Sequence, residues 1–126
     1  MGSLAALIAA LERAEEGSRE LSDEVLLALG WGTRLEFTRE VWVAPSGDSS
    51  KHRSDPTRNL QGAVDLVPEG MDWWEVGKVR DKPFMGRGTH RAAIGKWGEP
   101  EHYQHAMSPA LALCVAILRA VEAKDG

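Results

Sequence analysis

Four side chains that often bind metals, Glu99, Glu101, His102 and His105, lie close together in the stretch WGEPEHYQHAM. The two histidines are three residues apart, so on a helix they would share one face and could bind a metal ion. Such a site would need a third and a fourth ligand from elsewhere in the chain. The alternative is an exposed polar loop before the last helix, and the spacing alone favours the loop. We therefore expect no metal and no other cofactor.

Two further features raise the question of catalytic or phosphate-binding chemistry. Cys114 would need an activating base and partial exposure to act as a nucleophile, but its apolar neighbours predict a buried, inert thiol. The stretch MGRGTH has the glycines of a phosphate-binding loop, but it lacks the lysine and spacing of a P-loop and the strand-turn-helix context of a dinucleotide fingerprint. It is more typical of a hairpin tip. We expect no catalytic residue and no enzyme.

Basic residues gather between Lys78 and Lys96, where Asp81 is the only acidic residue, although the net charge of the chain is −4. With the aromatic residues nearby, this hairpin could bind a phosphate backbone and stack on bases, or it could dock on an acidic protein surface. The alternative is a solvated edge strand, because lysine and arginine also protect exposed edges from aggregation. The candidate binding surface comprises Trp73, Lys78, Arg80, Lys82, Arg87, Arg91 and Lys96.

Two adjacent tryptophans stand in VPEGMDWWEVGKVRDKP, which runs from Val67 to Pro83. Neighbouring side chains of a strand point to opposite faces, so Trp73 and Trp74 cannot share one apolar environment. If helices cover both faces of the sheet, Trp74 can join Val76 in the core on one side while Trp73 packs against a helix on the other. If helices cover only one face, one tryptophan is exposed. We expect both to be buried.

Helical periodicity and capping residues predict the helices that position these features. The apolar positions of residues 4–11 repeat at helical spacing, and Gly17 follows as a stop. Ser22, followed by two acidic residues, predicts the N-cap of a second helix that ends at Gly30-Trp31. Asn59 predicts the N-cap of a third helix, which Pro68 and Gly70 would close. The last helix begins at Ser108-Pro109, and we expect it to be the most buried.

Strands are predicted between these helices. Residues 34–43 change to a period of two and form one strand or a pair of short ones. Residues 44–56 have the Ser, Gly, Asp and Pro content of a flexible internal loop. Residues 72–80 and 90–97 predict an antiparallel hairpin. The fold class is therefore α+β, and we expect a three-layer α-β-α sandwich in which three to four helices surround a small, mainly antiparallel sheet of about three strands.

Length and composition limit the protein class. The chain has 126 residues, of which 43% are hydrophobic, which suits a single domain over residues 1–126. A net charge of −4 argues against a protein that coats nucleic acid or membrane with its whole surface. No apolar run approaches the roughly 20 residues that span a bilayer, and the N-terminus lacks the basic start of a signal peptide. A single cysteine, Cys114, excludes an internal disulfide and is typical of a reducing cytosol.

Three segments, taken in order, resemble the phage ABA sandwich domain and related small phage proteins. They are LSDEVLLALGW, PTRNLQGAVDLVPEG and MSPALALCVAILRAVEA, in which the matching positions are Gly30-Trp31, Thr57, Asn59, Ser108-Pro109 and Cys114. Asn59 stands where the family pattern has serine, and Gly62 where it has alanine. The N-terminal helix, within residues 1–17, lies outside the recognised part. The resemblance implies an α-β-α layered domain encoded by a phage or prophage, in a family without assigned activity, and it carries no site residue over.

These observations lead to two expected functions. The first is a small phage- or prophage-encoded, non-enzymatic interaction protein in the cytoplasm of a bacterial host cell, where it binds and modulates a host or phage protein; inhibition of a host defence system is one version. The alternative is a nucleic-acid-binding accessory module that uses the basic hairpin 78–96. Salt separates them, because contact with a phosphate backbone weakens steeply as salt rises. An uncovered edge of so small a sheet also leaves a homodimer open.

Overall fold

The computed structural model describes residues 3–47, 49–50, 55–79 and 88–125. Its helices are α1 (Leu4–Arg13), α2 (Arg19–Ala28), α3 (Leu60–Val64) and α4 (Pro109–Asp125). Its strands are β1 (Gly32–Glu36), β2 (Arg39–Val43), β3 (Ser49–Ser50), β4 (Trp73–Lys78), β5 (His90–Gly95) and β6 (Gln104–Ala106). Along the described chain, two runs of short strands thus separate the helices.

The strands form two separate antiparallel sheets, one in the order β1-β2-β3 and one in the order β4-β5-β6. The α+β class, the small three-stranded antiparallel sheet and the hairpin of β4 and β5 are therefore confirmed. The membership of the sheet differs from the prediction. The segment 34–43 is a hairpin in the other sheet, and β6 is the third strand instead, because three residues are too few to show a period of two.

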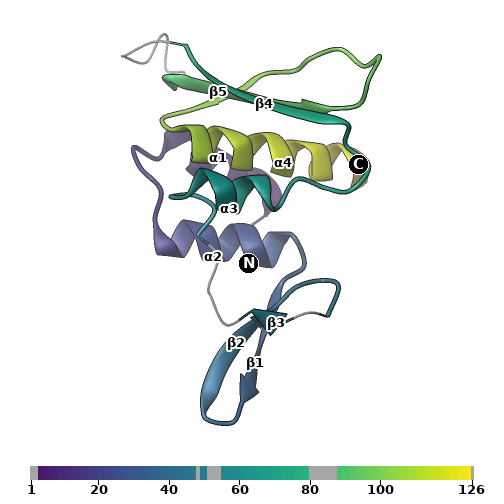
Figure 1. Ribbon diagram of the computed structural model, residues 1–126. Coiled ribbons are helices and arrows are strands. Elements are labelled where there is room, and N and C mark those ends of the chain that lie inside the picture. The colour runs from purple at the N-terminus through teal and green to yellow at the C-terminus, as the bar shows by residue number, and fades with distance from the viewer. Residues whose placement is uncertain (1–2, 48, 51–54, 80–87, 126) are drawn as a thin grey trace.

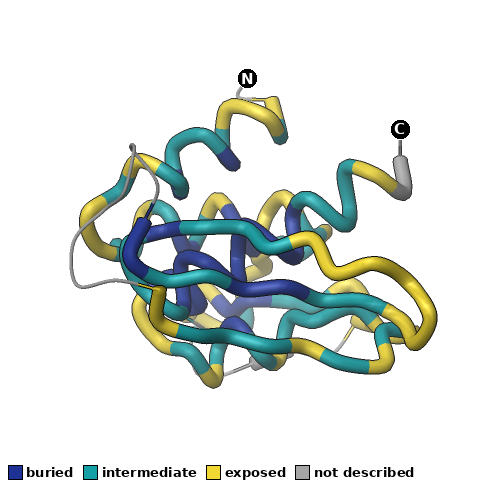
Figure 2. Tube along the Cα trace, turned by 90° about the horizontal axis from the view of Figure 1, so that it is seen from above, coloured by how far each residue is buried: buried dark blue, intermediate teal, exposed yellow. Residues whose placement is uncertain are grey.

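The helices all lie on one side of the β4-β5-β6 sheet (Figure 1). Helix α4 contacts all three strands of this sheet, and α1 and α3 pack on α4. Figure 2 looks down on the other face of the sheet and shows the strands in front of the helices. The order of layers is therefore sheet, helix and helix, and the predicted order of helix, sheet and helix is corrected in this respect.

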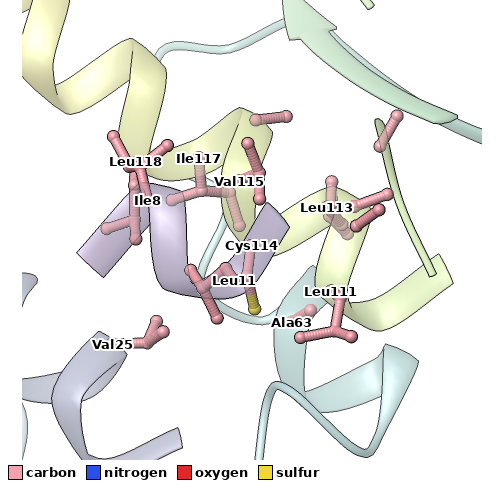
Figure 3. Packing of buried hydrophobic residues seen from close by; sticks show 14 residues of the cluster. Ile8, Leu11, Val25, Ala63, Leu111, Leu113, Cys114, Val115, Ile117 and Leu118 are labelled. Atoms are coloured by element: carbon pink, nitrogen blue, oxygen red, sulfur yellow. The ribbon is translucent and has the colours of Figure 1, made fainter. Parts of the chain in front are cut away.

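Helix α4 is the centre of the core. Every residue from Ala110 to Leu118 is buried, which is expected of a helix that is apolar all round and covered from several sides. Figure 3 shows Ile8, Leu11, Val25 and Ala63, from the other three helices, among the side chains that surround it. The prediction that the last helix is the most buried is confirmed. Its start is confirmed too, since the Ser108 Oγ accepts a 3.1 Å hydrogen bond from the Leu111 N–H.

The boundaries of the other helices follow the prediction with two exceptions. Helix α1 covers the predicted positions 4–11 and ends at Arg13, before Gly17, and Asn59 caps α3, which ends at Val64, earlier than expected. Helix α2 ends as predicted: Gly30 has a φ of 93°, and the Trp31 N–H donates to the Leu26 carbonyl. Its start was predicted wrongly, because Ser18 is the N-cap and Ser22 lies one turn inside the helix.

Ser22 instead connects α2 to the segment before α3. It is fully buried, and its hydroxyl donates to Asp55 Oδ1 while its oxygen accepts from the Thr57 N–H at 3.1 Å. Thr57 in turn donates its hydroxyl proton to the Ser18 carbonyl at 2.9 Å. The same approach explains Gly17, because a Cβ there would lie 2.0 Å from the Thr57 carbonyl oxygen. These contacts fix the start of α2 against residues 55–57.

The β1-β2 hairpin projects away from the layered part of the molecule (Figure 1). Its turn is formed by Phe37 and Thr38, and Phe37 has a φ of 62° and a fully exposed side chain. Of the predicted loop 44–56, residues 48 and 51–54 lie outside the described residues, while β3 pairs with β2. Packing does not explain this conformation of Phe37, because among the described residues nothing covers its side chain.

Candidate functional site

The register of the β4-β5-β6 sheet determines which side chains face the helices. Trp74 pairs with Ile94 and Val76 pairs with Ala92, and these partners share a face because residues directly opposite in a ladder point the same way. Val76 and Ile94 pack against the core, so this is the helix-covered face. Trp73 and the other odd-numbered residues of β4 and β5 therefore lie on the face that the described helices leave open, which we call the open face.

The expectation that both tryptophans are buried is wrong. Trp74 has the parity of the helix-covered face, but it lies at the end of the sheet, and 44% of it is exposed. Trp73 is half-buried although no helix covers it, because its ring lies across Gly95 of the neighbouring strand. A Cβ at Gly95 would come within 2.7 Å of the Trp73 Cζ2 atom. The half-burial of Trp73 thus depends on a glycine in the next strand rather than on a third layer.

Trp97 completes a group of three tryptophans at this end of the sheet. It lies in a turn from Lys96 to Glu99, in which the Glu99 N–H donates to the Lys96 carbonyl at 3.1 Å and Gly98 has a φ of 90°. The backbone N–H of Trp97 donates to Asp72 Oδ2 at 2.9 Å, and this bond connects the turn to the residue before β4. The side chain of Trp97 is nevertheless 78% exposed. The backbone is held and the indole is presented to solvent.

A depression of about 300 Å³ lies between these residues. Its lining consists of Trp73, Trp74, Glu75, Trp97, Gly98, Glu99 and Glu101. Three tryptophans and three glutamates thus line one small volume, next to the exposed connection between β5 and β6 that is visible in Figure 2. We call this the Trp/Glu depression.

Tyr103 joins two of the carboxylates. Its hydroxyl contacts Glu101 Oε2 at 2.7 Å and Glu75 Oε1 at 3.1 Å. The hydroxyl has one proton to donate, so a single proton serves two carboxylates. The bond to Glu101, partial burial and the bond to Glu75 together raise the pKa of Tyr103 to about 12. The phenol therefore stays neutral at physiological pH.

The Tyr103 bridge also explains a small residue in the middle strand. Glu75 lies in β4 and Tyr103 immediately precedes β6, so their hydrogen bond crosses above β5, where Ala93 pairs with Glu75. Ala93 is fully buried although it lies on the open face. Arg91, two residues earlier in β5, places its guanidinium carbon 4.3 Å from the centroid of the Tyr103 ring. The open face is thus partly covered by its own polar side chains.

The predicted binding surface is only partly described. Arg80, Lys82 and Arg87 lie outside the described residues. Trp73 and Arg91 share the open face, but Lys78 has the parity of the helix-covered face at the end of β4, and Lys96 is exposed beyond the end of β5. The structure therefore unites two of the predicted residues on one face. It adds Glu75, Glu99, Glu101 and Tyr103, whose proximity depends on β6 and was not predicted.

The structure also places the residues that were considered for metal binding, catalysis and phosphate binding. His105 lies in β6 and His102 in the exposed segment before it, so the two do not share a helical face. Among the described residues, no three His, Cys, Asp or Glu side chains gather closely enough to hold a metal ion. Burial raises the pKa of Cys114 to about 12, which leaves the thiol protonated and unsuited to nucleophilic attack. In MGRGTH, residues 85–87 lie outside the described residues, and a Cβ at Gly88 would collide with the Ala106 backbone.

The site and fold define a class: an α+β protein in which the described helices cover one face of a sheet, with an aromatic, acidic depression at one end of that sheet. The chain matches no protein-family model, no curated protein and no solved structure. Within the described part of the chain, no helix has the length and hydrophobicity to span a membrane. The chemistry of the Trp/Glu depression is therefore the basis for a proposed function.

Proposed function

We propose that this chain is a small, non-enzymatic interaction protein that binds a host or phage protein through the tryptophan-bearing end of its β4-β5-β6 sheet. The observation that carries the proposal is the cluster of Trp73, Trp74 and Trp97 around one depression. Tryptophan contributes more to protein interfaces than most residues, because it buries a large rigid area at little entropic cost. Exposing two indoles in one place costs solvation free energy unless a partner covers them.

The phage or prophage part of this proposal rests on the resemblance of three segments to small phage proteins. The cytoplasm of the bacterial host would then be the place of action, and inhibition of a host defence system one form of it. A buried Cys114 and the separation of His102 from His105 support a binding role over catalysis by these residues. The role of the protein would be to occupy or alter its partner.

The charges favour a protein partner over nucleic acid at this site. Glu75, Glu99 and Glu101 line the depression and would repel phosphate groups. Arg91, the described cation of the open face, stacks on Tyr103 beside two of these carboxylates. Stacking of bases on the tryptophans would therefore place a phosphate backbone close to negative charge.

The test is affinity purification of the tagged chain from cells of the native host, read by mass spectrometry with and without nuclease. We expect the wild-type chain to capture a specific protein, and the capture to survive nuclease treatment. Trp97→Ala should no longer capture that protein, although the fold does not need this 78% exposed side chain. The matched control is Phe37→Ala, which removes a fully exposed aromatic at the tip of the β1-β2 hairpin.

Three results would contradict the proposal. Removal of the captured material by nuclease would assign the surface to nucleic acid. Retention of the partner by Trp97→Ala together with its loss from Phe37→Ala would move the interface to the hairpin. Turnover of a substrate by the purified protein would exclude a purely non-enzymatic role.

A further inference from the structure

The indoles of the Trp/Glu depression are suited to a cation. The π face of an indole is negative, and tryptophan is the best of the aromatic residues at attracting a positive group within about 6 Å of its ring. Trp73, Trp74 and Trp97 all line the same depression, so a group that enters it lies close to several tryptophans. A volume of about 300 Å³ is at the lower end of the roughly 300–1,000 Å³ of ligand pockets, which suits one inserted side chain.

The carboxylates of the depression have the same preference. Glu75, Glu99 and Glu101 line it, whereas the nearby cations Arg91, which stacks on the Tyr103 ring, and Lys96 are not among the lining residues. Tyr103 supplies one proton to Glu75 and Glu101 together. The depression therefore holds an excess of hydrogen-bond acceptors and negative charge, and a bound cation with several N–H donors would satisfy both.

These features distinguish between kinds of cation. A metal ion is disfavoured, because among the described residues the carboxylates do not converge in a group that could hold one. A quaternary ammonium binds to aromatic rings but has no N–H group to donate to carboxylates. A guanidinium stacks flat on an aromatic ring and donates in its plane to carboxylates, so it matches both halves of the lining.

We infer that the Trp/Glu depression binds the side chain of an arginine presented by the partner polypeptide, with the guanidinium against the tryptophans that line the depression and its N–H groups directed at the lining glutamates. This inference rests on the proposed function, since the arginine belongs to the bound protein. It names the chemistry of the partner: a basic segment with an exposed arginine.

The probe is a short peptide, acetyl-Gly-Arg-Gly-amide, titrated into the ¹⁵N-labelled protein. Indole N–H signals report binding, and Trp31 and Trp42, which lie outside the depression, serve as internal controls. The matched ligand replaces arginine by citrulline, which has nearly the same shape but no charge. We expect the arginine peptide to shift the signals of Trp74 and Trp97 at concentrations at least about tenfold lower than the citrulline peptide. A lysine peptide should lie between the two.

Protein variants test the two halves of the lining. Trp97→Ala should abolish the shift at Trp74. The triple variant Glu75→Gln, Glu99→Gln, Glu101→Gln should remove the preference for arginine over citrulline. Its control, Glu15→Gln, Glu24→Gln, Glu40→Gln, makes the same change of net charge at exposed positions elsewhere and should leave the preference intact. If the first triple variant does not fold, the single variant Glu99→Gln, at an exposed position, should reduce the preference by itself.

Three outcomes would overturn the inference. Equal shifts with arginine and citrulline would show that charge is not recognised. Stronger shifts with a DNA oligonucleotide than with the arginine peptide would show an anionic ligand. Shifts of the same indole signals on dilution of the protein alone would show that a second copy of the chain fills the depression.

The inference and the proposed function can fail separately. If affinity purification captures a partner that needs Trp97 but not the three carboxylates, the interface stands and the arginine does not. If the arginine preference is found but no partner is captured, the depression has the inferred chemistry and the macromolecular function lacks support.

Discussion

Asp55 shows at the residue scale how a polar side chain outside any helix or strand can hold the fold together. Its carboxylate accepts from the Ser22 hydroxyl and from Arg58 Nε, the latter at 2.6 Å, and it lies 3.3 Å from Arg19. Burial raises the pKa of Asp55, but the hydrogen bonds from Arg58 and Ser22 and the charges of Arg19 and Arg58 outweigh it, so the pKa is lowered from 3.8. The folded state therefore favours the charged carboxylate.

This lowered pKa predicts a pH dependence of stability. Below pH 3.8 the unfolded carboxyl takes up a proton before the folded one does, so the contribution of Asp55 to stability is complete above that value and is lost as pH falls through the lower folded pKa. Urea unfolding of wild type and Asp55→Asn should differ by about 1–3 kcal/mol near neutral pH, and the difference should shrink below pH 3.8. A difference that does not change with pH would contradict this assignment.

At the element scale, the end of α2 depends on the backbone rather than on side chains. Gly30 has a φ of 93°, and the hydrogen bonds from the Gly30 and Trp31 N–H groups to the Leu27 and Leu26 carbonyls close the helix. A residue with a Cβ is strained in this conformation. The chain enters β1 directly after this turn, so the turn sets the direction of the β1-β2 hairpin relative to α2.

We predict that Gly30→Ala lowers the free energy of unfolding by about 1–2 kcal/mol, since alanine disfavours a positive φ. Gly32→Ala is the matched control two residues away: Gly32 lies in β1, has an ordinary φ, and a Cβ there would meet nothing within 4 Å. That control should change stability by less than about 1 kcal/mol and can increase it. Thermal or urea unfolding of the pair measures the difference, and equal losses would show that the φ of Gly30 is not the cause.

At the scale of the whole molecule, the position of α4 decides how many layers exist. Its residues from Ala110 to Leu118 are buried, with the sheet on one side and α1 and α3 on another. The sheet then has a helix-covered face and an open face, on which Glu75, Tyr103 and Trp73 cover their neighbours. Both Ala92 and Ala93 are fully buried in β5, but on opposite faces.

This arrangement predicts different costs for the same substitution at neighbouring positions. Ala92→Leu forces extra volume between the sheet and α4 and should lower the free energy of unfolding by about 1–3 kcal/mol. Ala93→Leu should cost less than about 1 kcal/mol, because the side chains above it can move into solvent. Urea unfolding compares the two variants. Similar losses in both would show that the open face is packed as tightly as the helix-covered one.

Much of the fold was predictable because it is encoded locally. The capping by Asn59 and Ser108, the Gly30-Trp31 helix end and the apolar periodicity of α1 depend on residues within one or two turns. Ser22 was misread for the same reason: its local pattern is that of an N-cap, whereas its partners, Asp55 and Thr57, are distant in sequence. The strand β6 has too few residues to show a period.

The candidate site was predictable only in part. The tryptophans were visible in the sequence, and Trp73 and Arg91 do share the open face. The carboxylates were visible too, but Glu99 and Glu101 were considered as metal ligands with His102 and His105 because only their spacing was known. Their proximity to Glu75 comes from the pairing of β5 with β6 and from the Tyr103 bridge.

By itself the sequence determined the type of most elements, the buried last helix and the inert Cys114, since periodicity, caps and local apolarity act over short distances. Only the tertiary structure decided that the helices lie on one side of the sheet, that Trp74 and Trp97 are exposed, and that carboxylates surround them. These features depend on which elements pack together, and a helix that is apolar all round, such as α4, can be covered from either side. The free energy of packing makes that choice over the whole chain.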